Sequence, residues 1–296
     1  MPRAKALLLI AAAASLAAQP TGGAFNGQAA LESARRAVAF GPRPSGSPPH
    51  ARLRRWLLDQ LKPLGCRLEL DAFTAATPRG PLPMTNIIAR FPGTTSRVIV
   101  VSGHYDTYHR PGLSFVGAND GGSSTGFLLE LARTLSRSRP RDSVWLVWLD
   151  GEESVVHWSG EDHTYGSRRL ARKWKDDATV ASLAALINVD MIGDAHLSLV
   201  YELNSTPWLR ETVWSAAARL GFAAHFPRHP AMAIEDDHLP FLQAGVPSLN
   251  LIDFDYGPDN SWWHTAADTP DKLSARSFQV VGQVILETLR LLGDRR

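Results

Sequence analysis

The chain has 296 residues, of which 44% are hydrophobic and 20% charged, a balance typical of a protein that buries one large core. The formal net charge is only +2, and no lysine- or arginine-rich run is interleaved with aromatic residues, so we expect no nucleic-acid partner. Cys66 is the single cysteine, which excludes an intrachain disulfide.

The first 18 residues have the pattern of a secretory signal peptide. Arg3 and Lys5 supply positive charge, the run 6–14 is apolar, and small residues follow it. That run is too short to cross a bilayer. We predict a signal peptide over residues 1–18, a linker over 19–28 and one domain over 29–296. The mature protein would be exported, periplasmic or secreted, without a membrane anchor.

The rest of the sequence alternates between helical and strand patterns. In chain order, the patterns predict two helices (29–40 and 51–64), three strands (67–73, 86–91 and 98–101), a helix (123–137), a strand (144–149), a helix (166–175), a strand (184–189), a helix (207–220), a strand (246–252) and a closing helix (272–292). This alternation is typical of a mostly parallel sheet with helices on both faces. We therefore predict an α/β fold: a three-layer αβα sandwich with a central mixed, mostly parallel sheet.

Polar side chains follow three of the predicted strands at the point where each strand ends. They are His104, the adjacent pair Glu152 and Glu153, and Asp190. Because sites in such sheets collect at the carboxyl ends of the strands, we expect these side chains to share one site. Adjacent carboxylates point in different directions, so one can bind a metal while the other carries a proton. The plain alternative for the pair is a solvated acidic turn.

Two further residues have ordinary roles when each is taken alone. Asp120 precedes a predicted helix, which it would cap, and His264 lies among aromatic residues, where a histidine commonly packs at an interface. The plain alternative for Asp190 is that it caps a turn. Together with Glu153, however, these residues form a set of oxygen and imidazole ligands without a thiolate, which zinc accepts.

Five motifs resemble, in order, those of the M28 zinc aminopeptidase superfamily: HYD at 104–106, GAND at 117–120, DGEE at 150–153, NVDMIG at 188–193 and WHT at 263–265. Within it the chain resembles the glutaminyl-peptide cyclotransferases, or glutaminyl cyclases. These share the DGEE, HWS and YGSR series within residues 150–171 and the segment IEDDHLPFL at 234–242. The resemblance implies the phosphorylase/hydrolase-like fold of the zinc aminopeptidases.

The resemblance also implies roles for individual residues. Asp120, Glu153 and His264 would bind one catalytic Zn²⁺, with a fourth position open for substrate. Glu152 would be the general base and acid.

Other residues would contact the substrate. Asp190 and Asp236 would be catalytic partner carboxylates near the reacting amine. Trp158 and Trp263 would wall the pocket that receives the glutaminyl side chain, with Glu235 beside them; the plain alternative for either tryptophan is core packing.

The activity implied is the conversion of an N-terminal glutamine of peptides or proteins to pyroglutamate with release of ammonia. N-terminal glutamate is a second candidate substrate, and we expect a monomer. The alternative is a secreted di-zinc aminopeptidase, in which His104 and Asp190 bind a second zinc and Asp120 bridges. A binding protein that has kept the pocket is a third reading, which an intact Glu152 disfavours.

Two departures from the animal cyclases concern the pocket. Glu235 stands where those enzymes carry a glutamine, which adds a carboxylate beside Asp236. The segment 253–262, which precedes the His264 motif, is also longer than in those enzymes. The shape of the pocket rim is therefore left open by the sequence.

Overall fold

The structure is a computed structural model that describes residues 24–295. The predicted signal peptide and the first half of the predicted linker lie outside the described residues. The first helix begins at Gly27, two residues inside the predicted linker, because the side chain of Asn26 caps it by accepting a hydrogen bond from the backbone N–H of Ala29 (3.1 Å). Among residues 24–295 no helix combines the length and the apolar character needed to cross a bilayer.

A six-stranded sheet forms the centre of the fold, in the order β1-β2-β4-β3-β5-β8. β3, β4, β5 and β8 run parallel to one another, whereas β2 is antiparallel to both β1 and β4. The predicted mixed, mostly parallel sheet is therefore confirmed. Its strands are β1 (Arg67–Thr77), β2 (Gly80–Phe91), β3 (Val98–His104), β4 (Ser143–Leu149), β5 (Leu183–Asp190) and β8 (Ser248–Ile252).

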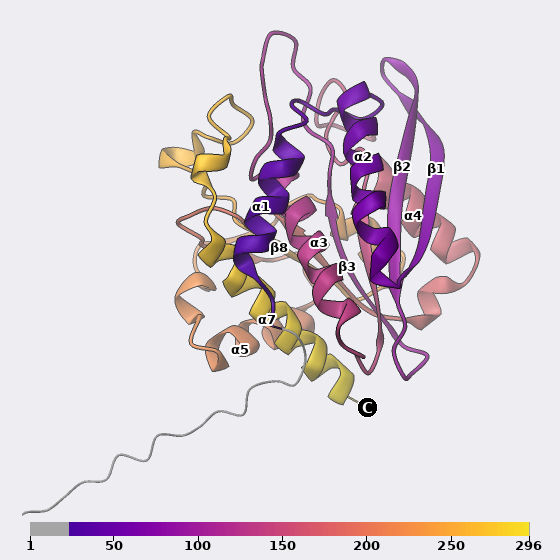
Figure 1. Cartoon of the computed structure of the whole chain (residues 1–296), viewed down its shortest axis with the longest axis vertical. Coiled ribbons are helices and arrows are strands. Elements are labelled where there is room, and N and C mark those ends of the chain that lie inside the picture. Colours follow the sequence, from indigo (N-terminus) through magenta and orange to yellow (C-terminus); the bar gives the residue numbers. More distant parts are fainter. Residues whose placement is uncertain (1–23, 296) are drawn as a thin grey trace, which may run out of the picture.

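Helices cover both faces of this sheet, which gives the predicted three layers. α1, α2, α3 and α7 lie on one face and α4 on the other (Figure 1). α5 packs with α7, and α6 packs against α4. The helices are α1 (Gly27–Val38), α2 (Pro48–Leu61), α3 (Gly122–Ser136), α4 (Tyr165–Asp176), α5 (Pro207–Arg219), α6 (His238–Gln243) and α7 (Ala275–Asp294).

Alternating burial along the inner strands explains their apolar sequences. In β3, Ile99 and Val101 join the core beneath α1 and α3, while Val98 and Val100 join the core beneath α4. All four residues are at most 5% exposed, so both faces of this part of the strand are buried among apolar side chains. No charged side chain interrupts β3, β4, β5 or β8, and the titratable residues His104 and Asp190 come where β3 and β5 end, at one edge of the sheet.

Among the strands, two features differ from the sequence prediction. β1 and β2 extend beyond the predicted strands to form a long hairpin, in which Thr77 pairs with Gly80. Pro81 and Pro83 suggested a loop, but this part of β2 has only β1 as a neighbour, because β4 pairs with β2 from Ile87 onward. A separate two-stranded parallel sheet, β6 (Tyr201–Glu202) and β7 (Ala231–Met232), was not predicted, since its strands are two residues long.

Candidate active site

The carboxyl edge of the sheet brings the predicted site residues together. β3 ends at His104, β5 ends at Asp190, and the turn after β4 carries Glu152 and Glu153. Asp120 comes from the turn before α3 and faces them. All five side chains are at most 6% exposed, so the sheet places four carboxylates and an imidazole in one buried cluster.

The first group in this cluster consists of Asp120, Glu153 and His264. Nε2 of His264 lies 3.2 Å from Oδ2 of Asp120 and 3.3 Å from Oε2 of Glu153. Among the described residues, these two buried oxygens have no polar partner other than this histidine. The histidine nitrogen and the two carboxylate oxygens face one another, and no neutral hydrogen-bond donor separates them. These three atoms fit the binding of a divalent cation.

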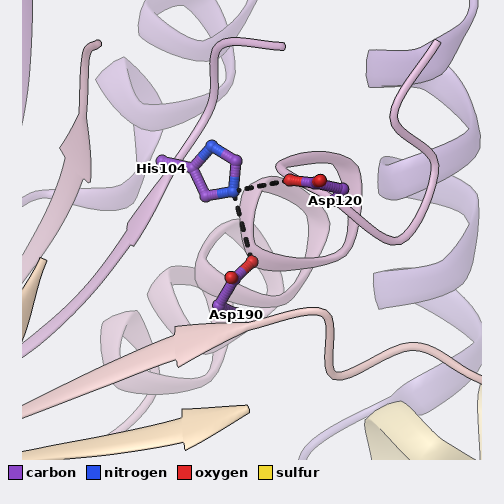
Figure 2. A group of neighbouring side chains, drawn as sticks. All are labelled: His104, Asp120 and Asp190. Carbon is purple, nitrogen blue, oxygen red and sulfur yellow. Dashed lines mark hydrogen bonds and ion pairs between the residues drawn. The ribbon is translucent and has the colours of Figure 1, made fainter. Parts of the chain in front are cut away.

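The second group consists of His104, Asp120 and Asp190. Nε2 of His104 lies 3.1 Å from Oδ1 of Asp120 and 3.2 Å from Oδ1 of Asp190 (Figure 2). Asp120 thus belongs to both groups, one through each of its carboxylate oxygens. The ligand atoms of the first group fit one cation. Those of the second group fit another cation when His104 has lost its proton.

Charge in the first group also favours a cation. Burial alone would lower the pKa of His264, but the carboxylates of Glu153 and Asp120 raise it to about 11. The ring therefore carries a proton that offsets two buried negative charges. A metal ion competes with such a proton for the same nitrogen, so the proton occupies the place that a zinc ion would take.

Glu152 belongs to neither of these two groups. Its carboxylate points toward the other ring nitrogen of His104, with Oε2 3.9 Å from Nδ1. Burial raises the pKa of Glu152 well above its ordinary range, and the negative charges of Glu153 and Asp236 act in the same direction. A carboxyl group with a raised pKa holds a proton more readily than an ordinary glutamate does, which suits a general acid–base role.

Asp190 and Asp236 line the same cavity as Glu152. Burial raises the pKa of Asp190 to about 7 and also raises the pKa of Asp236. Asp236 accepts hydrogen bonds from the amide groups of Asn188 (3.1 Å) and Asn250 (2.6 Å), which lie on the neighbouring strands β5 and β8. The sheet itself therefore fixes the orientation of Asp236.

These carboxylates lie at the bottom of a cavity of about 250 Å³. Its lining includes Trp158, Trp263 and Glu235, the residues expected to contact the substrate, and also Met232 and Phe254. Clefts for drug-sized ligands are roughly 300–1,000 Å³, so this cavity suits a single amino-acid residue.

Trp158 is held over the cavity from two sides. Its indole N–H donates to the Glu235 carboxylate (3.1 Å), and its ring stacks on His163 with centroids 4.2 Å apart. Nε2 of His163 in turn lies 3.7 Å from Glu235. Trp158 is 38% exposed, too much for an ordinary core residue, which argues against core packing for this tryptophan.

Comparison with known proteins identifies the relatives of this site. The profile of peptidase family M28 matches residues 86–289, which include all the cavity carboxylates. A glutaminyl-peptide cyclotransferase of Drosophila melanogaster is 32% identical over 252 residues, covering 77% of this chain and 70% of the relative. The chain belongs to the glutaminyl-peptide cyclotransferases of peptidase family M28.

Solved structures of the cyclotransferases share the fold. The crystal structure of a glutaminyl cyclase from an Acidobacteriales bacterium is 44% identical and superposes with a TM-score of 0.90, covering 96% of this chain and 100% of the relative. A zinc-dependent exopeptidase of Parabacteroides distasonis is 26% identical with a TM-score of 0.81, covering 93% of this chain and 100% of that one. The resemblance predicted from the motifs is therefore confirmed, and a hydrolase shares the scaffold.

The sequence predicted no role for several residues that build this cyclotransferase site. Asp268 accepts hydrogen bonds from the backbone N–H groups of Asn119 (2.8 Å) and Asp120 (3.2 Å). These bonds orient Asp120, whose carboxylate belongs to both groups. Asp106 accepts hydrogen bonds from the backbone N–H groups of Glu152 (3.2 Å) and Glu153 (3.3 Å). The position of Asp106 in the HYD motif was the available signal for its role, whereas Asp268 had none.

Arg43 was also missed, because its segment reads as a helix breaker. Its fully buried guanidinium donates to three backbone carbonyls, those of Tyr105 (3.1 Å), Val116 (2.5 Å) and Gly117 (2.9 Å). These bonds fix the loop that carries Tyr108, whose ring stacks on His264 with centroids 4.5 Å apart. His264 is therefore held by a loop that Arg43 orders.

Proposed function

We propose that this enzyme is a zinc-dependent glutaminyl-peptide cyclotransferase that converts the N-terminal glutamine of peptides or proteins to pyroglutamate and releases ammonia. One observation carries the proposal: Glu152, a buried carboxyl with a raised pKa, adjoins the Asp120–Glu153–His264 group in a cavity that fits a single residue. Family membership supports the same reaction.

Asp120, Glu153 and His264 would hold one Zn²⁺. When bound there, zinc would supply a Lewis acid that polarises the side-chain amide of the substrate and stabilises negative charge on its oxygen. Asp106 and Asp268 would keep the two ligand carboxylates in place through the backbone bonds described above.

The cavity walls would position the glutamine. Trp158 and Trp263 would contact the methylene groups and the amide plane of its side chain, with Trp158 fixed by Glu235. Asp190 and Asp236 lie in the same cavity and would accept hydrogen bonds from the neutral α-amine. Holding the amine and the amide of one residue at bonding distance removes the entropic cost of bringing them together, which is a large share of such a barrier.

Glu152 would carry the proton. As the α-nitrogen forms a bond to the Cδ carbonyl carbon, Glu152 accepts a proton from that nitrogen. The same carboxyl then donates the proton to the departing amide nitrogen as the Cδ–N bond breaks, and ammonia leaves. The proton balance closes on one side chain, and water is not a reactant.

A second candidate function is that of a di-zinc aminopeptidase, and the His104–Asp120–Asp190 group favours it. In that case His104 and Asp190 would be ligands of a second ion. Glu152 would then activate water for attack on the first peptide bond of the substrate, and the products would be a free amino acid and a shortened peptide.

Two further proposals concern where the enzyme acts and on what, and the N-terminal sequence pattern supports the first of them. The enzyme would be exported, and it would act as a monomer on peptides or exported proteins that begin with glutamine, or with glutamate as the second candidate.

One experiment separates the two activities. Ammonia release from a Gln-initiated dipeptide is measured beside nitroaniline release from Leu-p-nitroanilide, with zinc per chain determined on the same sample. We expect ammonia, no nitroaniline and one zinc. Nitroaniline with two zinc ions per chain would establish the aminopeptidase.

A further inference from the structure

His264 is the least enclosed of the three proposed zinc ligands. Its side chain is 21% exposed, whereas those of Asp120 and Glu153 are at most 4% exposed. Its backbone has a φ of 53°, a left-handed conformation that a residue other than glycine keeps only when its surroundings stabilise it. The segment that carries His264 therefore needs contacts that hold this side chain toward the two carboxylates.

Hydrogen bonds do not supply this orientation. A histidine that binds a metal ordinarily donates a hydrogen bond from its other ring nitrogen to a carboxylate, a carbonyl or a water, which fixes the direction of the ring. Within residues 24–295, both polar contacts of the His264 ring, to Asp120 and to Glu153, are made by Nε2, and no protein group accepts a bond from Nδ1. The protein therefore orients this ring in another way.

Aromatic rings enclose the imidazole on both faces. The ring of Tyr108 stacks on His264 with centroids 4.5 Å apart and an interplanar angle of 7°, and the indole of Trp263 stacks on it at 4.1 Å and 21°. Two rings so close and so nearly parallel to the imidazole cannot share one face of it, so His264 lies between them. Phe115 adds an edge contact at 5.6 Å. These attractive contacts would be lost if the imidazole turned.

Tyr108 also contacts a second proposed ligand, through its backbone. Its N–H donates to Oε1 of Glu153 (2.9 Å), and the other oxygen of that carboxylate faces His264. One residue thus touches two of the three ligands and fixes them relative to each other. Trp263 lines the catalytic cavity and Tyr108 does not, so the Tyr108 ring acts on the ligand and not on the substrate.

The plain alternative is that the Tyr108 ring only packs the loop after β3. That loop has other supports, because Arg43 donates to backbone carbonyls at both of its ends, and Phe115 is buried beneath it at 1% exposure. The half-buried ring of Tyr108 is therefore not required for the loop to fold. Its stack on His264 accounts better for its position.

We propose that Tyr108 is a positioning residue for the metal site. Its ring takes the place of the hydrogen-bond partner that ordinarily orients a zinc-binding histidine, and it keeps Nε2 of His264 directed at Asp120 and Glu153. The inference rests on the proposed function, since it requires His264 to be a zinc ligand. The affinity for the metal then depends on an aromatic ring outside the catalytic cavity.

The test compares zinc affinity, measured by competition with a chelator, in three variants of Tyr108. Tyr108→Leu and Tyr108→Gln remove the aromatic ring and keep the backbone N–H, and we expect each to bind zinc about tenfold or more weakly than the wild type. Tyr108→Phe loses only the hydroxyl and should match the wild type. His109→Ala, an exposed substitution at the next position, is the matched control and should leave the affinity unchanged.

Two further readouts separate positioning from contact with the substrate and from loss of structure. At saturating zinc, Tyr108→Leu should keep the wild-type KM for Gln-Phe amide, and a raised KM would place the ring against the substrate instead. In NMR spectra of the metal-free protein, the ring protons of His264 should shift in Tyr108→Leu and not in Tyr108→Phe, because only the leucine variant lacks the ring current. A variant that has lost structure would lose the dispersion of its whole spectrum, and the comparison then uses the other ring-free variant.

The outcomes distinguish this inference from the proposed function. Wild-type zinc affinity in Tyr108→Leu and Tyr108→Gln would overturn the positioning role and leave the cyclotransferase standing. A Tyr108→Phe variant as weak as Tyr108→Leu would also overturn it, because the ring would then not be the orienting group. A wild type that binds no zinc would instead overturn the proposed function.

Discussion

The buried edge of the sheet and the mouth of the cavity are built in different ways. At the edge, the carboxylates of Asp106, Asp236 and Asp268 each accept at least two hydrogen bonds from backbone or amide N–H groups. At the mouth, Trp158 is held by one ring stack and one hydrogen bond to Glu235, an exposed residue. The edge is therefore suited to fixing reacting groups, and the mouth to accommodating different peptides.

This contrast predicts that substitutions at the edge act on metal content and turnover, whereas substitutions at the mouth act on substrate affinity. The largest effect should follow from Asp120, which belongs to both candidate metal groups. Asp120→Asn should lose zinc and at least about 10³-fold in kcat/KM, because the loss of Lewis-acid stabilisation is worth several kcal/mol.

Asp190→Asn is the matched control, since it belongs to the second group alone. In a one-zinc enzyme it should keep the zinc content of the wild type, determined by metal analysis, although its turnover falls. A wild type with two zinc ions and an Asp190→Asn variant with one would contradict the assignment of a single metal group.

Asp268 tests how far the rigidity of the edge depends on a residue outside the ligand set. Asp268→Asn keeps the shape of the side chain but replaces one of the two acceptors for the N–H groups of Asn119 and Asp120. We expect zinc affinity, measured by competition with a chelator, to fall about 10–100-fold. Asp271→Asn, an exposed substitution three residues away, should leave it unchanged. Equal affinities in both variants would remove Asp268 as a positioning residue.

Trp158 tests the mouth. Trp158→Ala should raise KM about tenfold while kcat falls less, because the indole contributes to binding in both the ground state and the transition state. Trp208→Ala, at an equally exposed tryptophan outside the site, should leave KM unchanged. An unchanged KM in Trp158→Ala would exclude this residue from the pocket.

Glu235 refines the same prediction. Glu235→Ala should raise KM in the direction of Trp158→Ala by a smaller factor, because the indole loses its hydrogen-bond acceptor. Glu235→Gln retains an acceptor oxygen and should restore a KM close to that of the wild type. If Glu235→Gln were as impaired as Glu235→Ala, the charge of Glu235 rather than the hydrogen bond would matter.

Glu202, beneath the mouth, has the smallest expected effect at neutral pH, and it acts on stability. This buried carboxylate lies beside His238 and accepts bonds from Ser205 and from the N–H of Ile234 (3.0 Å), which fixes the segment that carries Glu235. Burial opposes the charged form, but these partners outweigh it and lower the pKa of Glu202 to about 2.

A folded-state pKa below the unfolded value of about 4.3 stabilises the fold above that pH, and the contribution is lost as the pH falls toward 2. Thermal denaturation should therefore give Glu202→Gln a lower Tm than the wild type at pH 7, and the difference should narrow below pH 4. The exposed substitution Glu161→Gln should show no such trend. A gap that stays constant with pH would contradict the lowered pKa.

The sequence predicted the residues at the carboxyl edge of the sheet better than those at the mouth of the cavity. Two apolar strands end at His104 and Asp190, and a third is followed by the turn that carries Glu152; because parallel strands align their carboxyl ends, these residues revealed the carboxyl edge of the sheet. The partner that orients Asp120 lies 148 residues away at Asp268, and no local pattern connects the two. The walls around Met232 and Phe254 come from separate loops and a two-residue strand, so their meeting depends on the folded chain.

The central claim is that two adjacent carboxylates have separate roles, Glu153 as a metal ligand and Glu152 as the proton carrier. The most direct test measures zinc content and ammonia release from Gln-Phe amide for Glu152→Gln and Glu153→Gln together. We predict that Glu152→Gln keeps wild-type zinc and loses about 10²–10⁴-fold in kcat, whereas Glu153→Gln loses zinc. Retained turnover in Glu152→Gln, or loss of zinc from it, would contradict the division of roles.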